Sequence, residues 1–315
     1  MKDYSRSGAT APRFFATLFV ASLRRRERKV LPAFLILLLA SSAFPQVKPQ
    51  NPGSHSSHPT PTMTAEATAL LEEAMGIVCT QAKLDPKSSV PIDEMQARPS
   101  LPIHSPEAKA GAERAQRLLP VAKSLVVSSL QQLATEYGFR KSPRFNLRLR
   151  QAILRVNSVR HVKPDMESRD NASVYLSRPR VITFGTIFLA GLRSDEGMIS
   201  VLAHELMHIA DGEHDSLRPL VTAVGKKASG LTALDVRGQR AEEVVCDLIG
   251  TMAVRAHIVS TLDYESIARR LARAVQHNCV EIDEGDEDHL SPRQTIRAIL
   301  ALKPGIVREL INDRF

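Results

Sequence analysis

The chain has 315 residues, enough for one large domain or two small ones, and 43% of them are hydrophobic, so it can bury a core. The net charge of +8 would suit a nucleic-acid partner if it were spread over the chain. Residues 1–44, however, hold eight Lys or Arg and two acidic residues, which supply +6 and leave +2 for the rest. We therefore expect no nucleic-acid partner.

The N-terminal segment has the order of an export signal. A basic stretch at 24–29 precedes an apolar run at 30–40, and the small residues Ser41 and Ala43 suit cleavage before Phe44. The apolar run is shorter than the roughly 20 residues that span a bilayer. Residues 1–44 are thus predicted to be a cleaved signal of an exported, periplasmic or secreted protein. The alternative is an uncleaved anchor, with membrane association through residues 30–44 and the rest of the chain outside the cytoplasm.

Two further segments precede the C-terminal half. Residues 45–62 are rich in Pro, Ser, His and Gly and predict a disordered linker. Residues 63–140 form a predicted N-terminal helical region, with helices at 64–83 and 107–138, the second interrupted near Pro120. The five prolines in residues 85–106 predict an irregular connection between them.

Residues 141–315 mix short strands with helices. Alternating apolar residues predict strands at 144–158, 174–176 and 181–184, with a polar loop at 162–171. Helical spacing predicts helices at 195–210, 241–258, 262–277 and from Pro292 to about Leu302, whereas 211–240 reads as a loop or loose helix. The predicted fold class is α+β, mainly helical, with a small sheet.

The stretch His204-Glu205-Leu206-Met207-His208 lies in the predicted helix 195–210. Residues four apart share one helix face, so the two imidazoles can hold one zinc ion. Glu205 beside them can act as general base on a zinc-bound water. One Zn²⁺ per chain is the predicted cofactor.

Zinc of this kind needs a third protein ligand, and the sequence offers rivals. His214 lies ten residues after His204, which is the spacing of the metzincin pattern. That pattern has a glycine at the position that Asp211 occupies here. On the helix 241–258, Glu243 and Asp247 are four apart and share a face. We predict Glu243 as the third ligand and Asp247 as the carboxylate that holds a ligand imidazole, with His214 and Glu242 as alternative ligands.

The two motif helices resemble those of the gluzincin peptidases in the HtpX, Oma and CAAX-prenyl-protease group, metallopeptidase family M forty-eight. Members show a His-Glu-x-x-His helix and then a Glu-x-x-Ala-Asp helix, and residues 194–208 and 243–250 resemble these. Cys246 stands where the family has Ala. The resemblance covers about residues 145–300 and implies a zincin-type catalytic domain with a small sheet and two zinc-binding helices.

Two weaker likenesses extend the resemblance. Residues 288–292 resemble a Thr-His-Pro-Ser-Pro segment, with Leu290 in place of its first Pro, and imply His289 as a catalytic donor that stabilises the oxyanion. Asn171 before a strand resembles an Asn-Ala-Phe segment and is expected to line the cleft. The family also implies that an edge strand such as 181–184 pairs with an extended peptide. The multiple membrane helices of some members are absent, which implies a soluble exported type.

The three cysteines make an odd count. In an exported protein Cys79 and Cys279 could pair, although sequence alone cannot show it. Cys246 is expected to be a small buried thiol rather than a zinc ligand.

These inferences predict a zinc metalloendopeptidase that hydrolyses cell-envelope or misfolded proteins, with a protein or peptide as substrate. The alternative, from another class, is a zinc-stabilised, non-proteolytic binding or chaperone protein of the cell envelope. An intact Glu205 favours the enzyme, because a structural zinc site needs no base.

Overall fold

The computed structural model describes residues 63–313, apart from 177–179, 262–263, 276–278 and 280–284. The predicted export signal and linker therefore lie outside the described residues, as does part of the acidic stretch before His289. None of the helices that the structure describes has the length and apolar character needed to cross a bilayer.

The described chain is mainly helical with one small sheet, which confirms the predicted α+β class in these terms. Its helices are α1 (Ala65–Leu84), α2 (Ile92–Ala97), α3 (Pro106–Glu136), α4 (Pro143–Ser158), α5 (Thr186–Gly191), α6 (Asp195–Asp211), α7 (Arg218–Thr232), α8 (Gln239–Ser260), α9 (Ile267–Val275), α10 (Pro292–Leu302) and α11 (Pro304–Asn312), with a short 3-10 turn at Phe139–Lys141. Its strands are β1 (His161–Asp165), β2 (Ala172–Val174) and β3 (Val181–Gly185).

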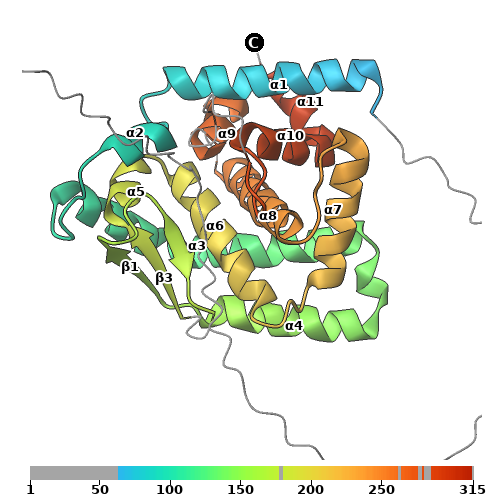
Figure 1. Cartoon of the computed structure of the whole chain (residues 1–315), viewed down its shortest axis with the longest axis horizontal. Helices are drawn as coiled ribbons and strands as arrows, with labels where there is room; N and C mark the ends of the chain where they lie inside the picture. Colours follow the sequence, from blue (N-terminus) through green and yellow to red (C-terminus); the bar gives the residue numbers. More distant parts are fainter. Residues whose placement is uncertain (1–62, 177–179, 262–263, 276–278, 280–284, 314–315) are drawn as a thin grey trace, which may run out of the picture.

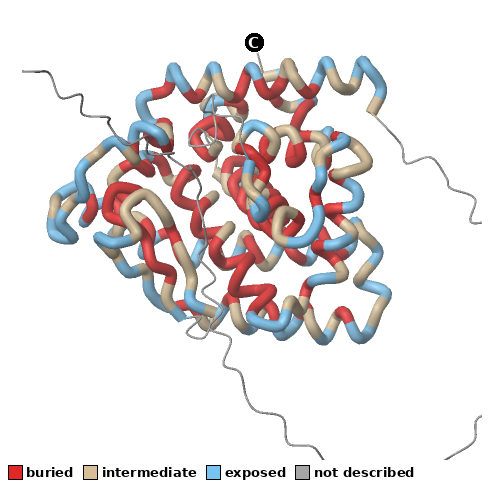
Figure 2. Tube along the Cα trace, in the orientation of Figure 1, coloured by how far each residue is buried: buried red, intermediate tan, exposed pale blue. Residues whose placement is uncertain are grey.

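Helices α6 and α8 lie at the centre of the molecule (Figure 1), where most of their residues are buried (Figure 2). Helix α6 packs against α8, α3, α4 and α9. The two central helices approach closely at Gly250, where a Cβ would lie 3.0 Å from the backbone oxygen of Ser200. Buried residues from both sides of residue 140 belong to one hydrophobic cluster, so the two predicted regions share a core.

The sheet has the order β1-β3-β2 and lies to one side of the central helices (Figure 1). Strand β3 pairs in parallel with β1 and antiparallel with β2. The prediction that residues 181–184 form an edge strand is therefore wrong, because hydrogen bonds on both sides make β3 central. The predicted polar loop at 162–171 is also partly wrong, since β1 begins at His161.

Residues 144–158 form helix α4 and not the predicted strand. Ser142 caps the helix by accepting a hydrogen bond from the Phe145 backbone N–H, and Pro143 occupies its first position. The buried side chains of α4 follow at helical intervals, whereas Leu147, which suggested alternation, is 53% exposed. The apparent alternation therefore combined the buried Phe145 and Leu149 with the exposed Leu147.

Four smaller differences concern the predicted helices. Helix α2 lies within the connection predicted as irregular, and α7 occupies half of the segment predicted as a loop or loose helix. Helix α3 continues through Pro120 without the predicted break. A further helix, α11, begins at Pro304, directly after the predicted end of the C-terminal helix.

Cys79 on α1 and Cys279 after α9 form a disulfide, which confirms the pairing considered from the sequence. Helix α1 lies across α9, α10 and α11 (Figure 1) and packs against them. The bond joins residues 200 apart in the chain and links α1 to Cys279.

Candidate metal centre

Helix α6 positions the two histidines of the motif. Ser194 caps its N-terminus by accepting from the Gly197 backbone N–H, and Gly212, at φ 73°, ends it in a conformation that favours glycine. The Nε2 atoms of His204 and His208 lie 3.2 Å apart. Both side chains are at least four-fifths buried, so they face a site that is nearly closed to solvent.

Helix α8 supplies a carboxylate to the Nδ1 atom of each histidine. Asp247 Oδ1 lies 2.7 Å from His204 Nδ1, and Glu242 Oε1 lies 3.0 Å from His208 Nδ1. An Nδ1–H that donates to a carboxylate leaves the Nε2 lone pair available and fixes the orientation of the ring. Asp247 thus has the place predicted for it, while Glu242 has an equivalent place that the sequence did not predict.

Glu243 lies on the opposite side of the imidazoles from these two carboxylates. Its Oε2 atom is 3.4 Å from His204 Nε2 and 3.5 Å from His208 Nε2. The two Nε2 atoms and this oxygen therefore converge on one point between α6 and α8.

Cys246 also belongs to the cluster. His204, His208 and Cys246 form a group that could hold a metal ion. The Sγ atom lies 3.6 Å from His208 Nδ1, on the ring edge that faces Glu242. Burial raises the pKa of the Cys246 thiol to about 11, against the opposing effect of His208. The Sγ atom faces the Nδ1 edge of His208, whereas Glu243 Oε2 faces the Nε2 atoms of both histidines, so Glu243 is the better-placed candidate ligand.

The charges of the metal-free cluster compensate one another. Burial by itself lowers the pKa of His204, but Asp247 and Glu243 raise it well above its usual value. For His208 the same effect of burial is outweighed by Cys246, Glu243 and Glu242. Burial raises the pKa of Glu243, yet the two histidines hold it well below its usual range. Protons and a metal ion would therefore compete for the same atoms.

Glu205 is almost fully buried, at 1% exposed, beside the two histidines. Burial raises its pKa, against the opposing charges of His204 and His208. Its Oε2 atom has no hydrogen-bond partner among the described residues. A buried carboxylate oxygen without a partner is costly to stability and points to a group that the protein alone does not provide.

His289 lies near the cluster and His214 does not belong to it. The Nε2 atom of His289 is 4.0 Å from Glu243 Oε1, and its Nδ1 atom is 3.0 Å from Asp286 Oδ1. His214 is exposed in the turn after α6 and is in neither of the metal-binding groups that the described residues form. Asn171 precedes β2, where its carbonyl accepts a hydrogen bond from the Gly185 N–H.

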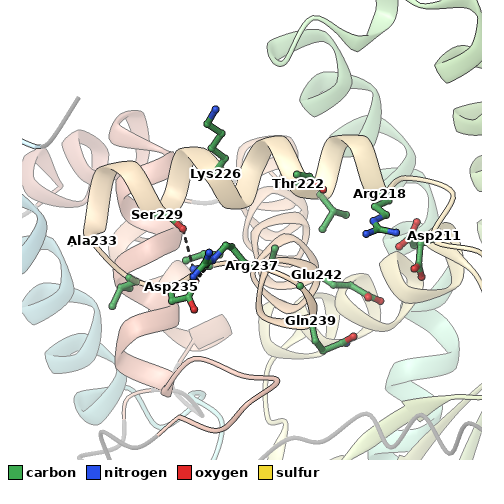
Figure 3. Close-up of a pocket in the computed structure, with 16 residues that line it drawn as sticks. Asp211, Arg218, Thr222, Lys226, Ser229, Ala233, Asp235, Arg237, Gln239 and Glu242 are labelled. Carbon is green, nitrogen blue, oxygen red and sulfur yellow. Dashed lines mark hydrogen bonds and ion pairs between the residues drawn. The ribbon is translucent and has the colours of Figure 1, made fainter. Parts of the chain in front are cut away.

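The second group that could hold a metal ion consists of Asp211, Asp215 and Glu242. It borders a cavity of about 1040 Å³ between α7 and the first turn of α8 (Figure 3). Gln239 and Glu242 project from this end of α8, so the cavity wall and the metal centre share residues of one helical turn.

No protein-family model, curated protein or solved structure matches the chain. The resemblance to the gluzincin peptidases therefore remains a prediction that rests on the motifs of α6 and α8.

Three residues that support the site were not predicted from the sequence. Glu242 was considered only as a ligand, although a carboxylate next to the predicted ligand Glu243 could have suggested support for the second histidine. Gln239 donates from Nε2 to Glu243 Oε1 at 2.8 Å, and its spacing of four residues from Glu243 was a usable signal. Arg155 on α4 donates to the carbonyls of Ile209, Ala210 and Asp211 at the end of α6. No sequence signal links Arg155 to α6, because they meet only in the fold.

Proposed function

We propose that the protein is a zinc-dependent endopeptidase with a zincin-type catalytic domain, which acts on cell-envelope or misfolded proteins. The observation that carries the proposal is the convergence of His204 Nε2, His208 Nε2 and Glu243 Oε2. Their separations are 3.2, 3.4 and 3.5 Å. Atoms at about 2.0–2.1 Å from one tetrahedral zinc ion lie about 3.4 Å apart, so the three atoms fit three corners of such a site.

The donor set also suits a catalytic ion better than a structural one. Two imidazoles and a carboxylate leave the fourth position to water, whereas structural sites use four protein ligands. A zinc ion held there would lower the pKa of that water and polarise a peptide carbonyl.

Glu205 is the proposed general base. It follows His204 in the helix but turns about 100° away from it, so it need not bind the ion. It is buried, and burial raises its pKa, which strengthens it as a base relative to an exposed carboxylate. Glu205 would accept the proton of the attacking water and pass it to the leaving amine, while His289 is proposed to donate to the developing oxyanion.

Strand β2 is the better candidate for pairing with a peptide substrate, now that β3 is known to be central. Within the described residues β2 pairs only with β3, and it packs beside α6, the helix of His204 and His208. An extended peptide added to its other edge would run along the helix that carries His204 and His208.

The disulfide between Cys79 and Cys279 supports an exported protein, because such bonds persist in oxidising compartments. We accordingly keep the predicted periplasmic or secreted location, with membrane anchoring by residues 30–44 as the alternative.

The test combines metal analysis with a protease assay on the purified full chain. We expect about one zinc per chain and cleavage of an unfolded protein such as casein. Glu205→Gln should keep the zinc and the fold but lose about 10²–10⁴-fold in activity, the typical contribution of a general base. Cleavage that is equal in Glu205→Gln and wild type would refute this role. A wild type that binds zinc but cleaves no member of a peptide library would favour the non-proteolytic binding protein.

A further inference from the structure

Gln239 is the first residue of α8, and Gly238 directly before it forms the turn into the helix. Gly238 has φ 57° and ψ −129°, a conformation that side-chain-bearing residues rarely adopt. This turn brings the chain from the wall of the α7–α8 cavity into the helix. Gln239 therefore starts α8 one turn before Glu243, on the same face.

The two oxygens of Glu243 have different partners. Oε2 faces the Nε2 atoms of both histidines, whereas Oε1 accepts a hydrogen bond of 2.8 Å from Gln239 Nε2. The last torsion of a glutamate is broad and roughly two-fold, so an unrestrained carboxylate can rotate Oε2 away from the imidazoles. A donor fixed on Oε1 restricts that rotation.

The chemistry of the donor suits this task. The amide of Gln239 is neutral, so it orients the carboxylate without cancelling the negative charge that a metal ion requires. An arginine or lysine at this place would form an ion pair and compete with the metal. Glu243 is 8% exposed, and the amide of Gln239 is the hydrogen-bond donor to its Oε1 atom.

We infer that Gln239 is a positioning residue for the proposed metal ligand Glu243, and that it sets the metal affinity of the site. The inference rests on the proposed function only in so far as that function places a metal ion at Glu243. Residues that support metal ligands typically change affinity 10–100-fold when they are replaced. Gln239 is half-buried and borders the cavity, from which water could partly replace its amide, so we expect the lower end of that range.

The experiment measures zinc affinity of the purified full chain by competition with a chromophoric chelator. Gln239→Met keeps the length of the side chain and removes its donors, and we expect it to bind zinc about tenfold more weakly. Lys226→Ala is the matched control, because Lys226 lines the same cavity on α7 and its side chain points away from α8 (Figure 3). It should bind zinc as the wild type does.

Two further readouts separate positioning from a general structural role. The thermal midpoint of metal-free Gln239→Met should fall by a few degrees at most, since one hydrogen bond to Glu243 is lost but no cavity is made. The visible spectrum of the cobalt-substituted protein should change in Gln239→Met and not in Lys226→Ala, because it reports the ligand geometry.

The outcomes distinguish this inference from the proposed function. Wild-type zinc affinity in Gln239→Met would overturn the inference, whatever the protease assay gives. A wild type that binds zinc without cleaving peptides would overturn only the proposed activity, and the affinity comparison would still decide the role of Gln239. A wild type that binds no zinc would overturn both.

Discussion

Two clusters of buried charge lie at opposite ends of α6. Near its N-terminus, Arg270 of α9 binds Glu196 at 2.6 Å, and Arg273 binds Asp85 at 2.6 Å and also Glu265. Near its C-terminus lie the histidines and carboxylates of the candidate metal centre. Both clusters are buried, yet they differ in how their charges are compensated.

The arginine cluster is complete within the protein. Each guanidinium faces carboxylates at hydrogen-bonding distance, so the chain itself compensates the buried charge. In the metal cluster, three potential ligand atoms converge, and Glu205 has a carboxylate oxygen without a hydrogen-bond partner among the described residues. The comparison teaches that burial of charge alone does not indicate a functional site. Donor atoms directed at one point, with no lysine or arginine among them, do.

The largest expected effect on zinc binding comes from replacing Glu243, the proposed third ligand. Glu243→Gln should weaken zinc binding by more than about 100-fold, the upper end for residues that merely support ligands. His214→Ala should leave zinc binding unchanged, because His214 is exposed outside the cluster. Zinc content measured on both purified variants decides the matter, and equal content would refute Glu243 as a ligand.

The arginine cluster should respond in stability instead. Asp85→Asn removes one charged partner of Arg273, which keeps Glu265, so the free energy of unfolding should fall by about 1–3 kcal/mol. Denaturant titration measures the loss, and zinc affinity should not change. If Asp85→Asn kept its stability but bound zinc more weakly, the assignment of the arginine cluster to stability alone would be wrong.

The same cluster predicts a dependence of stability on pH. Burial raises the pKa of Asp85, but hydrogen bonds from Lys87 and Arg273 and the charges of Arg273 and Arg269 lower it overall. A carboxyl with a lowered pKa stabilises the fold above its unfolded value of about 4 and loses that contribution as the pH falls. Wild type should therefore lose stability below about pH 4 more steeply than Asp85→Asn.

Replacing Glu242 tests whether the carboxylates at the Nδ1 atoms of His208 and His204 contribute equally to zinc affinity. Glu242→Gln keeps a hydrogen-bond acceptor for His208 Nδ1 but removes the charge, so zinc affinity should fall about 10-fold, at the weak end for such supporting residues. Asp247→Asn should do the same at His204. A loss in Glu242→Gln as large as that in Glu243→Gln would instead favour Glu242 as the ligand.

The last prediction concerns protons at the candidate metal centre. The pKa values of His204 and His208 are raised in the metal-free protein, so zinc must displace protons from them. Zinc affinity should fall by about tenfold per pH unit for each proton displaced as the pH is lowered through those values. Titration calorimetry in two buffers of different ionisation enthalpy counts the protons. Zinc binding without proton release would contradict the raised pKa values.

The sequence by itself determined the parts of the centre that lie within one helix. The spacing of His204 and His208 is a property of any α-helix, as is that of Glu243 and Asp247, so the structure only had to keep α6 and α8 helical. The limits of those helices were predictable for the same reason, because capping residues and apolar periodicity act locally.

Only the tertiary structure decided which partners meet. The pairing of Glu242 with His208, and of Arg155 with the end of α6, depends on the packing of α8 and α4 against α6. The helix at residues 144–158, by contrast, has local signals in Ser142, Pro143 and the helical spacing of its buried residues, which the apparent alternation obscured. Strand β3 became central because hydrogen bonds from β1 and β2 on its two sides come from separate segments. Local periodicity carries no information about such partners, whose contacts form only when distant segments pack together.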